Sequence, residues 1–274
     1  PSQAAEIGSI ASDSIREASG LAPSGWTDER LWVINDGGWP AAIHAVGRDG
    51  ADLGSTLVTN IDNVDWEDLD SFKLNGARYL LIADIGDNMA ARDDVALHFV
   101  PEPGPDGATT ATATRTIRFR YPDGPRDAES IAVDAAEGAA YILSKRTIPA
   151  ELYRVALTYA PPGEPVVAEY LGTVESLPQP SREEIEQAPV KQDWGWQPTA
   201  MDFSADGKSA VLLTYRAVYT YTRAKGESWY EALQSRPTVQ SLGLYFGAES
   251  VALRGNDILV TFEALNPPLL QFPL

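Results

Sequence analysis

Short runs in which apolar and polar residues alternate recur along the whole chain. Alternation with a period of two is typical of β-strands that bury one face. Five of these runs begin with a polar residue and follow one another at intervals of 48, 62, 70 and 50 residues. Such regular recurrence indicates a repeat architecture. The five runs are SGLAPS from Ser19, EDLDSF from Glu67, ESIAVD from Glu129, TAMDFS from Thr199 and ESVALR from Glu249.

Further strand-like runs follow each of these leading runs. The second strands, such as RLWVIND and RYLLIAD, are rich in the β-branched and aromatic residues that strands favour. Four-stranded units repeated at a period of about 50 to 70 residues are typical of a β-propeller. We therefore predict an all-β fold in which residues 1–274 form a single five-bladed β-propeller domain.

The ends and insertions of the repeats give more detailed predictions. The last repeat stops after its third strand, and residues 4–11 (AAEIGSIA) are predicted to supply the fourth strand and close the ring. In the third repeat, VVAEYLG at 166–172 is predicted as the fourth strand, and 174–198 as a loop with one helical turn at 181–188. A six-bladed ring is the alternative, because the two longer intervals contain insertions.

Composition and charge restrict the partners. The chain has 39 acidic residues against 21 Lys and Arg, a net charge of -18 and no cysteine. This charge argues against binding to nucleic acid, and the missing thiols exclude disulfides and cysteine-based metal sites. No apolar run approaches the roughly 20 residues of a membrane span. Since the chain starts at Pro1, we expect a removed export signal and a secreted or periplasmic protein, and we expect a monomer.

The leading residues of the five inner strands are the candidate metal ligands. The first strand of every propeller blade lines the central channel, so these residues should form a ring around the axis. Three carboxylates in such a ring repel one another unless a cation joins them, and oxygen ligands suit Ca²⁺ better than Mg²⁺ or Zn²⁺. The sequence thus predicts a Ca²⁺ cofactor. The alternative is that these side chains bond backbone groups between blades and neutralise nearby Lys or Arg. The predicted ligands are Ser19, Glu67, Glu129, Thr199 and Glu249.

The order Ser, Glu, Glu, Thr, Glu at the blade starts resembles that of the soluble calcium-activated nucleotidases, or apyrases, which are five-bladed propellers with a central calcium. The resemblance implies that Asp36, in VINDGG, lies in the substrate pocket. It further implies phosphate contacts from Lys145 and Arg146, in ILSKRT, and from Arg216, in LLTYRA.

The chain also departs from the family pattern. Gly37 and Gly38 stand where the family has an arginine shortly after the first-blade aspartate. The second blade ends in IADIGDN, which brings in Asp84 and Asp87 at a position where we expect fewer acids in a nucleotidase. These two acids either repel a polyphosphate or hold a second cation that binds it.

The predicted site chemistry is metal-dependent hydrolysis of a phosphate-bearing small molecule. Asp36, Asp84 or Asp87 is predicted to serve as the general base. Trp196 and Tyr215 are predicted to stack on a base or sugar, and the alternative for such aromatic residues is packing between blades.

Two other classes of function remain open at the level of sequence. A glycoside hydrolase would use acids of the same cleft, Asp36, Glu67 and Glu129, as its catalytic pair, and a lactonase-like calcium propeller is a related hydrolase. A non-catalytic secreted propeller would use calcium as a structural element and bind a protein or a glycan.

Overall fold

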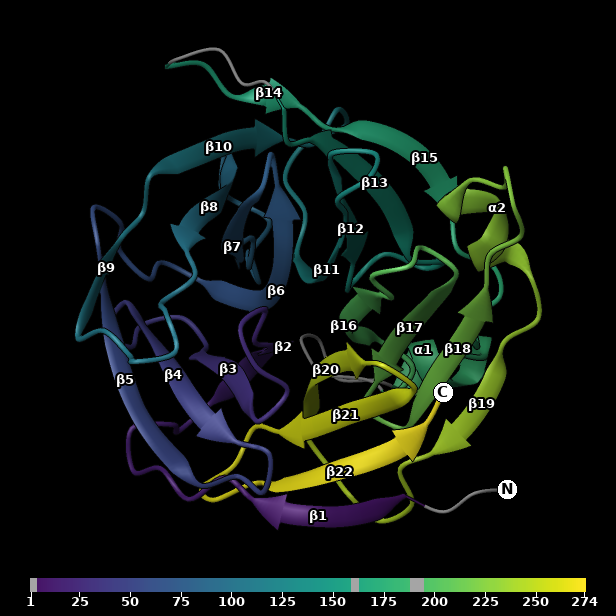
Figure 1. The fold of residues 1–274 in the computed structure, drawn as a ribbon. Coiled ribbons are helices and arrows are strands. Elements are labelled where there is room, and N and C mark those ends of the chain that lie inside the picture. Colours follow the sequence, from purple (N-terminus) through teal and green to yellow (C-terminus); the bar gives the residue numbers. More distant parts are fainter. Residues whose placement is uncertain (1–3, 159–162, 188–194) are drawn as a thin grey trace.

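Five sheets, antiparallel except for one short parallel pair in each of two of them, surround a central axis in the computed structural model, which describes residues 4–158, 163–187 and 195–274 (Figure 1). The fold is all-β, with the arrangement of a five-bladed β-propeller, as the repeats predict. The six-bladed alternative is wrong, because the five sheets account for every repeat.

The blades follow one another along the chain. Blade 1 contains β2 (Ala18–Pro23), β3 (Arg30–Asn35), β4 (Ala42–Gly47), β5 (Asp52–Thr59) and β9 (Thr110–Thr112). Blade 2 contains β6 (Trp66–Leu74), β7 (Ala77–Asp84), β8 (Val95–Pro101), β10 (Arg115–Arg120) and β14 (Val166–Val167). Blade 3 contains β11 (Ala128–Asp134), β12 (Ala139–Ser144), β13 (Glu151–Ala156) and β15 (Glu169–Thr173). Blade 4 contains β16 (Pro198–Phe203), β17 (Ser209–Thr214), β18 (Ala217–Thr222) and β19 (Thr238–Ser241). Blade 5 contains β20 (Ala248–Arg254), β21 (Asp257–Phe262), β22 (Pro268–Pro273) and β1 (Ala5–Ser9).

The N-terminal strand closes the ring. β1 pairs antiparallel with β22, with Ala5 opposite Gln271 and Ser9 opposite Pro268. This confirms the strand predicted at 4–11. The two ends of the chain thus meet in one sheet, which fastens the first and last repeats together (Figure 1).

The predicted fourth strand of the third repeat is wrong in one respect, since it divides between two blades. Val166 and Val167 pair in parallel with β10 of blade 2, and the strand in blade 3 starts only at Glu169. β9 similarly leaves its own repeat and pairs in parallel with β5 of blade 1. The pattern of apolar and polar residues records burial and not the identity of the neighbouring strand, so it does not reveal either exchange.

Two short helices lie between strands. α1 (Arg182–Gln187) agrees with the helical turn predicted at 181–188. α2 (Trp229–Gln234) was not predicted, although Ser228 and Glu231 form a capping box at its start. Its Trp229 is buried against blade 4. Among the described residues, no helix is long and apolar enough to cross a membrane.

The hydrophobic core lies between neighbouring blades. One cluster joins Leu81 and Phe99 of blade 2 to Ile131 and Tyr153 of blade 3. Equivalent clusters join the other pairs of blades, so each sheet stabilises the orientation of the next.

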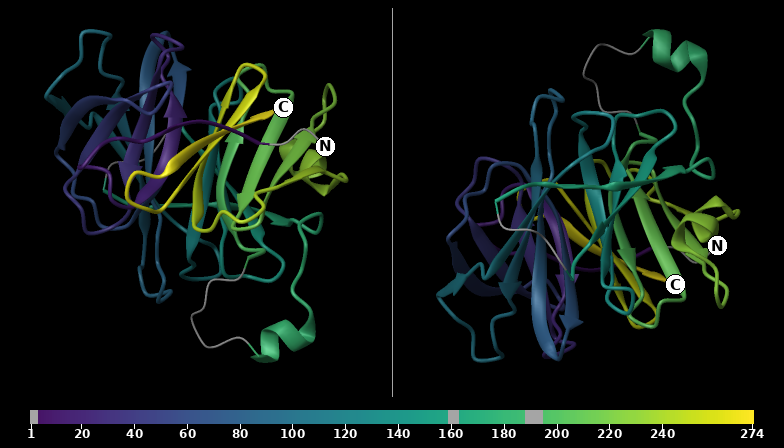
Figure 2. Two further views of the ribbon diagram at one scale, coloured as in Figure 1. Left: turned by 90° about the horizontal axis from the view of Figure 1, so that it is seen from below. Right: turned by 90° about the horizontal axis from the view of Figure 1, so that it is seen from above.

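The two faces of the propeller differ. In blade 3, Ala128 pairs with Ser144 and Glu151 pairs with Thr173, so the inner strand starts at the face where the chain leaves for α1. Side views show α1 standing away from this face, which we call the α1 face (Figure 2). The inner strands end at the other face, which we call the opposite face.

Candidate metal centre

Each predicted ring residue is the extra residue of a β-bulge. In blade 1, Ala18 pairs with Asn35 and Gly20 pairs with Ile34, so Ser19 has no partner across the ladder. A bulge turns a side chain away from the regular alternation, and bulges are common beside functional sites. The backbone is therefore equivalent at all five positions. The same interruption occurs at Glu67, Glu129, Thr199 and Glu249.

The two hydroxyl residues bond to the next blade. The Ser19 hydroxyl donates to the backbone carbonyl of Glu67 at 2.6 Å, and the Thr199 hydroxyl donates to that of Ala248 at 2.7 Å. These bonds match the structural alternative. A hydroxyl oxygen that donates one bond keeps its lone pairs, so the predicted ligand role of both residues stays a prediction.

A buried lysine contacts one ring glutamate directly and a second one through Tyr215. The Lys145 ammonium, 3% exposed, forms an ion pair with Glu129 and donates to the Tyr215 hydroxyl at 2.9 Å. Tyr215 donates in turn to Glu249 at 3.0 Å. Lys145 and Tyr215 thus lie within the ring itself and supply a charge and a hydrogen bond to Glu129 and Glu249.

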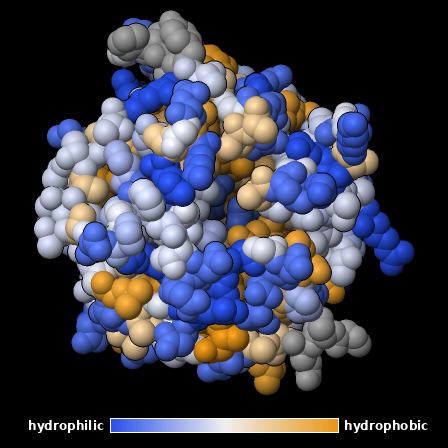
Figure 3. All heavy atoms as spheres, viewed as in Figure 1, coloured by the Kyte–Doolittle hydropathy of each residue, from blue (hydrophilic) through white to orange (hydrophobic). Residues whose placement is uncertain are grey.

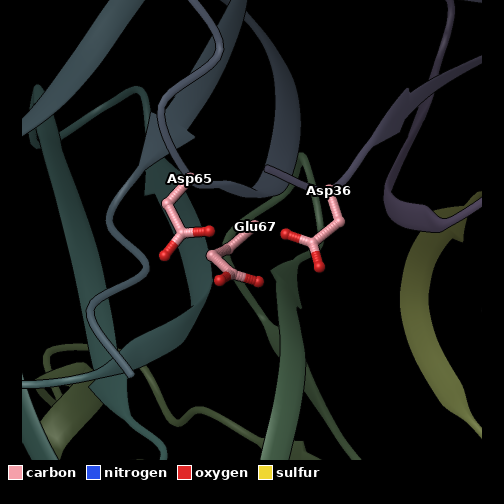
Figure 4. Close-up of side chains that lie close together, drawn as sticks. All are labelled: Asp36, Asp65 and Glu67. Carbon is pink, nitrogen blue, oxygen red and sulfur yellow. The ribbon is translucent and has the colours of Figure 1, made fainter. Parts of the chain in front are cut away.

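Glu67, the third glutamate, belongs to a compact group of carboxylates. One carboxylate oxygen each from Asp36, Asp65 and Glu67 lie within 4.8 Å of one another (Figure 4). Asp36 follows β3 in blade 1, Asp65 immediately precedes β6 of blade 2, and Glu67 is the second residue of β6. We call these residues the acidic triad. None of the three forms an ion pair with a described residue.

Sequence reasoning missed Asp65 as a ligand, although a signal for it was present. Asp65 and Glu67 are separated by Trp66, which is fully buried. Asp65 lies just before β6 and Glu67 is the bulge residue of that strand, so the signal is the close spacing of two acids around a buried tryptophan and not the regular alternation of a strand.

Two glycines form walls of the acidic triad. A Cβ atom on Gly86 would lie 2.2 Å from the Glu67 carboxylate and 2.4 Å from that of Asp65. A Cβ atom on Gly37 would lie 2.4 Å from Asp65 Oδ1. The departure from the nucleotidase pattern at Gly37 therefore has a local reason, because a side chain there would enter the triad.

Gly86→Ala should weaken the predicted calcium binding without changing any charge. The new methyl group forces the Glu67 and Asp65 carboxylates apart, and we expect the calcium affinity to fall about a hundredfold, since carboxylate geometry sets calcium affinity. Calorimetric titration with Ca²⁺ measures this change. The matched control is Gly104→Ala, because a Cβ atom there meets nothing within 4 Å. Unchanged affinity in Gly86→Ala would contradict binding at the triad.

The acidic triad is electrostatically unfavourable without a cation. Burial is the main cause that raises the pKa of Asp36 to about 6. The negative charges of Asp65, Glu263 and Glu17 raise it further, and the hydrogen bond from the Gly37 amide partly opposes them. Burial and the neighbouring charge of Glu129 raise the pKa of Glu67 well above its usual range. Burial also raises the pKa of Asp65, although the Arg92 charge opposes it. A bound divalent ion would remove this penalty.

The stability of calcium-free protein should therefore rise as the pH falls from about 7.5 to about 5. A carboxyl group whose folded-state pKa is raised contributes stability below its unfolded pKa and loses it as the pH rises through the folded value, about 6 for Asp36. Saturating Ca²⁺ should abolish this part of the dependence, because a bound ion would keep the carboxylates of the folded protein ionised across this pH range. The measurement is the difference between the Tm profiles in EGTA and in Ca²⁺. A difference that stays constant across this range would contradict the prediction.

Asp84 and Asp87 have other partners. Asp84 forms an ion pair with Arg92 at 2.8 Å, and its pKa is lowered because the neighbouring His98, at 3.7 Å, and Arg92 together outweigh the effect of burial. Asp87 accepts the backbone amides of Ala91 at 2.8 Å and Arg92 at 2.9 Å. Both carboxylates thus stabilise the 85–92 loop. Their predicted catalytic role stays a prediction.

The remaining predicted contacts are dispersed. Arg146 forms an ion pair with Asp127 at 2.6 Å. Arg216 is exposed and packs against Gly195, whereas Trp196 is 6% exposed. The structure brings Asp36 and Glu67 together and joins Lys145 to Tyr215. The substrate contacts expected of Arg146, Arg216 and Trp196 stay predictions.

The acids that follow Glu67 along β6 have different partners from Glu67 itself. Asp68 and Asp70 accept the amides of Ile131 at 2.8 Å and Val133 at 2.7 Å in blade 3. The structural alternative, in which acids bond to backbone amides of the next blade, therefore holds for Asp68 and Asp70, which follow Glu67 along β6. Asp65 and Glu67, the two triad residues of this acidic run, instead lie beside Asp36 of blade 1.

Comparison with known proteins gives the fold. No known protein family and no curated protein sequence matches the chain. A chain in the crystal structure of a nidogen/laminin complex is similar, with a TM-score of 0.50 and 13% identity over 90% of this chain and 73% of that chain. The structure of U3-55K matches with a TM-score of 0.42 and 11% identity over 94% and 68% of the two chains. At such identities the nidogen/laminin likeness supports the propeller fold alone.

Proposed function

We propose that this chain is a calcium-dependent propeller hydrolase that acts on a phosphate-bearing small molecule, as its resemblance to the apyrases implies. The observation that carries the proposal is the acidic triad, three carboxylates within 4.8 Å that have no ion-pair partner among the described residues. Three negative oxygen donors without a nitrogen or sulfur ligand suit a hard cation. Bound Ca²⁺ would polarise a phosphoryl oxygen and supply charge for anion binding.

The protein side chains divide the other tasks. Asp36 is half-buried with a pKa of about 6, so it can accept a proton near neutral pH, and it is the predicted base that lies in the triad. Arg146 and Arg216 are the predicted phosphate contacts with exposed surface. Lys145 is buried against Glu129, so its charge would act on the substrate from within the ring.

The experiment is phosphate release from a panel of nucleoside di- and triphosphates in Ca²⁺ and in EGTA. We expect release in Ca²⁺ alone, and its loss in Glu67→Gln and Asp36→Asn. Calcium binding without release from any member of the panel would overturn the hydrolase and leave the metal site standing.

A non-catalytic calcium propeller is the second candidate. The pairing of Lys145 with Glu129 and of Arg146 with Asp127 favours it, because both cations already have acidic partners. In that case calcium would join blades 1 and 2, and the α1 face would bind a protein or a glycan. The export and monomeric state expected from the sequence belong to either proposal, and gel filtration tests the latter.

A further inference from the structure

A second axial site lies on the opposite face of the propeller. The inner strands end there around a cavity of about 480 Å³, to which all five blades contribute. The space-filling view looks onto this face and shows it hollowed near the axis (Figure 3). A cavity of this size is typical of small-molecule sites. Nothing in the proposed function uses it, since the acidic triad lies at the start of the same strands.

Two equivalent aspartates line the cavity. Asp70 of β6 and Asp202 of β16 each stand three residues after the bulge residue of their strand. Asp70 accepts the amide of Val133 at 2.7 Å, and Asp202 accepts that of Leu253 at 2.6 Å. Both side chains are more than nine-tenths buried, and these amides fix their orientation.

The basic residues of the cavity have other partners or lie at its mouth. Arg223 forms an ion pair with Asp134 at 3.1 Å and lies over the Trp229 ring at 3.9 Å. Arg78 donates to the carbonyl of Gly25, and Lys73 is exposed. Asp70 and Asp202 form no ion pair with a described residue.

Burial disfavours the ionised form of both aspartates. Burial raises the pKa of Asp70 to about 7. Burial and the charge of Asp70 raise the pKa of Asp202 well above its usual range. A cation beside both carboxyl groups would lower this cost.

We propose that the cavity binds a small primary amine with an apolar body, its ammonium group lying beside Asp70 and Asp202. An organic cation fits better than a metal ion, because the cavity of about 480 Å³ far exceeds an ion and one oxygen of each aspartate already accepts an amide. The apolar wall includes Phe203, which stacks on Trp229 at 3.8 Å. Both faces of Trp229 are covered, so the carboxyl groups and not this ring would hold the ammonium group.

The test is calorimetric titration of the full chain at pH 8 with n-hexylamine, with hexan-1-ol as the uncharged probe. We expect the amine to bind at least about tenfold more tightly than the alcohol, and the double variant Asp70→Asn/Asp202→Asn to lose that preference. Asparagine keeps an oxygen for each amide, so the variant should fold, and its thermal unfolding checks this. Asp206→Asn at the rim, where Asp206 pairs with Lys208, is the matched control.

Equal affinity for amine and alcohol, no binding of either, or an unchanged preference in the double variant would overturn the proposal. Calcium binding that survives Glu67→Gln but is lost in the double variant would also overturn it, because the cavity would then be an inorganic cation site. The proposed hydrolase fails separately, since its variants lie on the α1 face and should leave hexylamine binding unchanged.

Discussion

Glu67→Gln should abolish the stabilisation by calcium that we propose for this protein. A ligand at a thousand times its Kd stabilises a folded protein by about 4 kcal/mol, which corresponds to a rise in Tm of roughly 8 °C for a chain of this size. Glu67 is the ring residue that lies in the acidic triad, and glutamine removes its charge with little change in volume. In EGTA, the variant should be at least as stable as the parent, because a buried carboxyl group with a raised pKa has been neutralised.

Two variants make this result specific. Asp62→Asn removes an exposed acid near the same strand and should leave the calcium response intact. Glu249→Gln occupies the equivalent bulge in blade 5, so loss of the response there would extend the ligand set to the predicted ring. A full calcium response in Glu67→Gln would remove Glu67 from the site.

Lys145→Met should destabilise the protein by about 3 to 5 kcal/mol, because removing one partner of a buried ion pair leaves the other charge uncompensated. The ammonium group is 3% exposed and pairs with Glu129, and it also donates to Tyr215. Methionine keeps the length and apolar volume of the side chain. Urea unfolding in EGTA measures the loss.

The double variant Lys145→Met/Glu129→Gln is the control for the ion pair. Removing both charges should restore most of the lost stability, since no buried charge then lacks a partner. If the double variant is as unstable as the sum of the two single variants, the two residues do not stabilise each other, and the interpretation of Lys145 as an internal cation is wrong.

The blade framework could be predicted from sequence because each inner strand starts with a polar residue at a bulge. Ser19 and Thr199 align with the three glutamates for that reason, even though their side chains bond to carbonyls of the next blade. The alignment of residue types thus predicted five equivalent backbone positions correctly. It did not distinguish a side chain that bonds to the next blade from one that faces other carboxylates.

The composition of the acidic triad depends on contacts between blades, which the sequence pattern does not record. Asp65 precedes β6 within a run of acids, while Lys145 directly follows the second strand of blade 3 and reaches Glu129 on the first. The pairing of Val166 with blade 2 could not be predicted for the same reason, because the sequence of a strand does not identify the strand it pairs with. The requirement for glycine at 37 and 86 is likewise visible only in the structure, because it depends on the carboxylates that lie against these two positions.

The acidic triad is tested most directly by calorimetric titration of Ca²⁺ into parent protein that has been stripped of metal with EGTA. We expect one ion to bind per chain, and we expect its heat to disappear in Asp65→Asn, a residue that belongs to the triad and not to the predicted ring. No binding to the parent, or unchanged binding in Asp65→Asn, would contradict a calcium site formed by Asp36, Asp65 and Glu67.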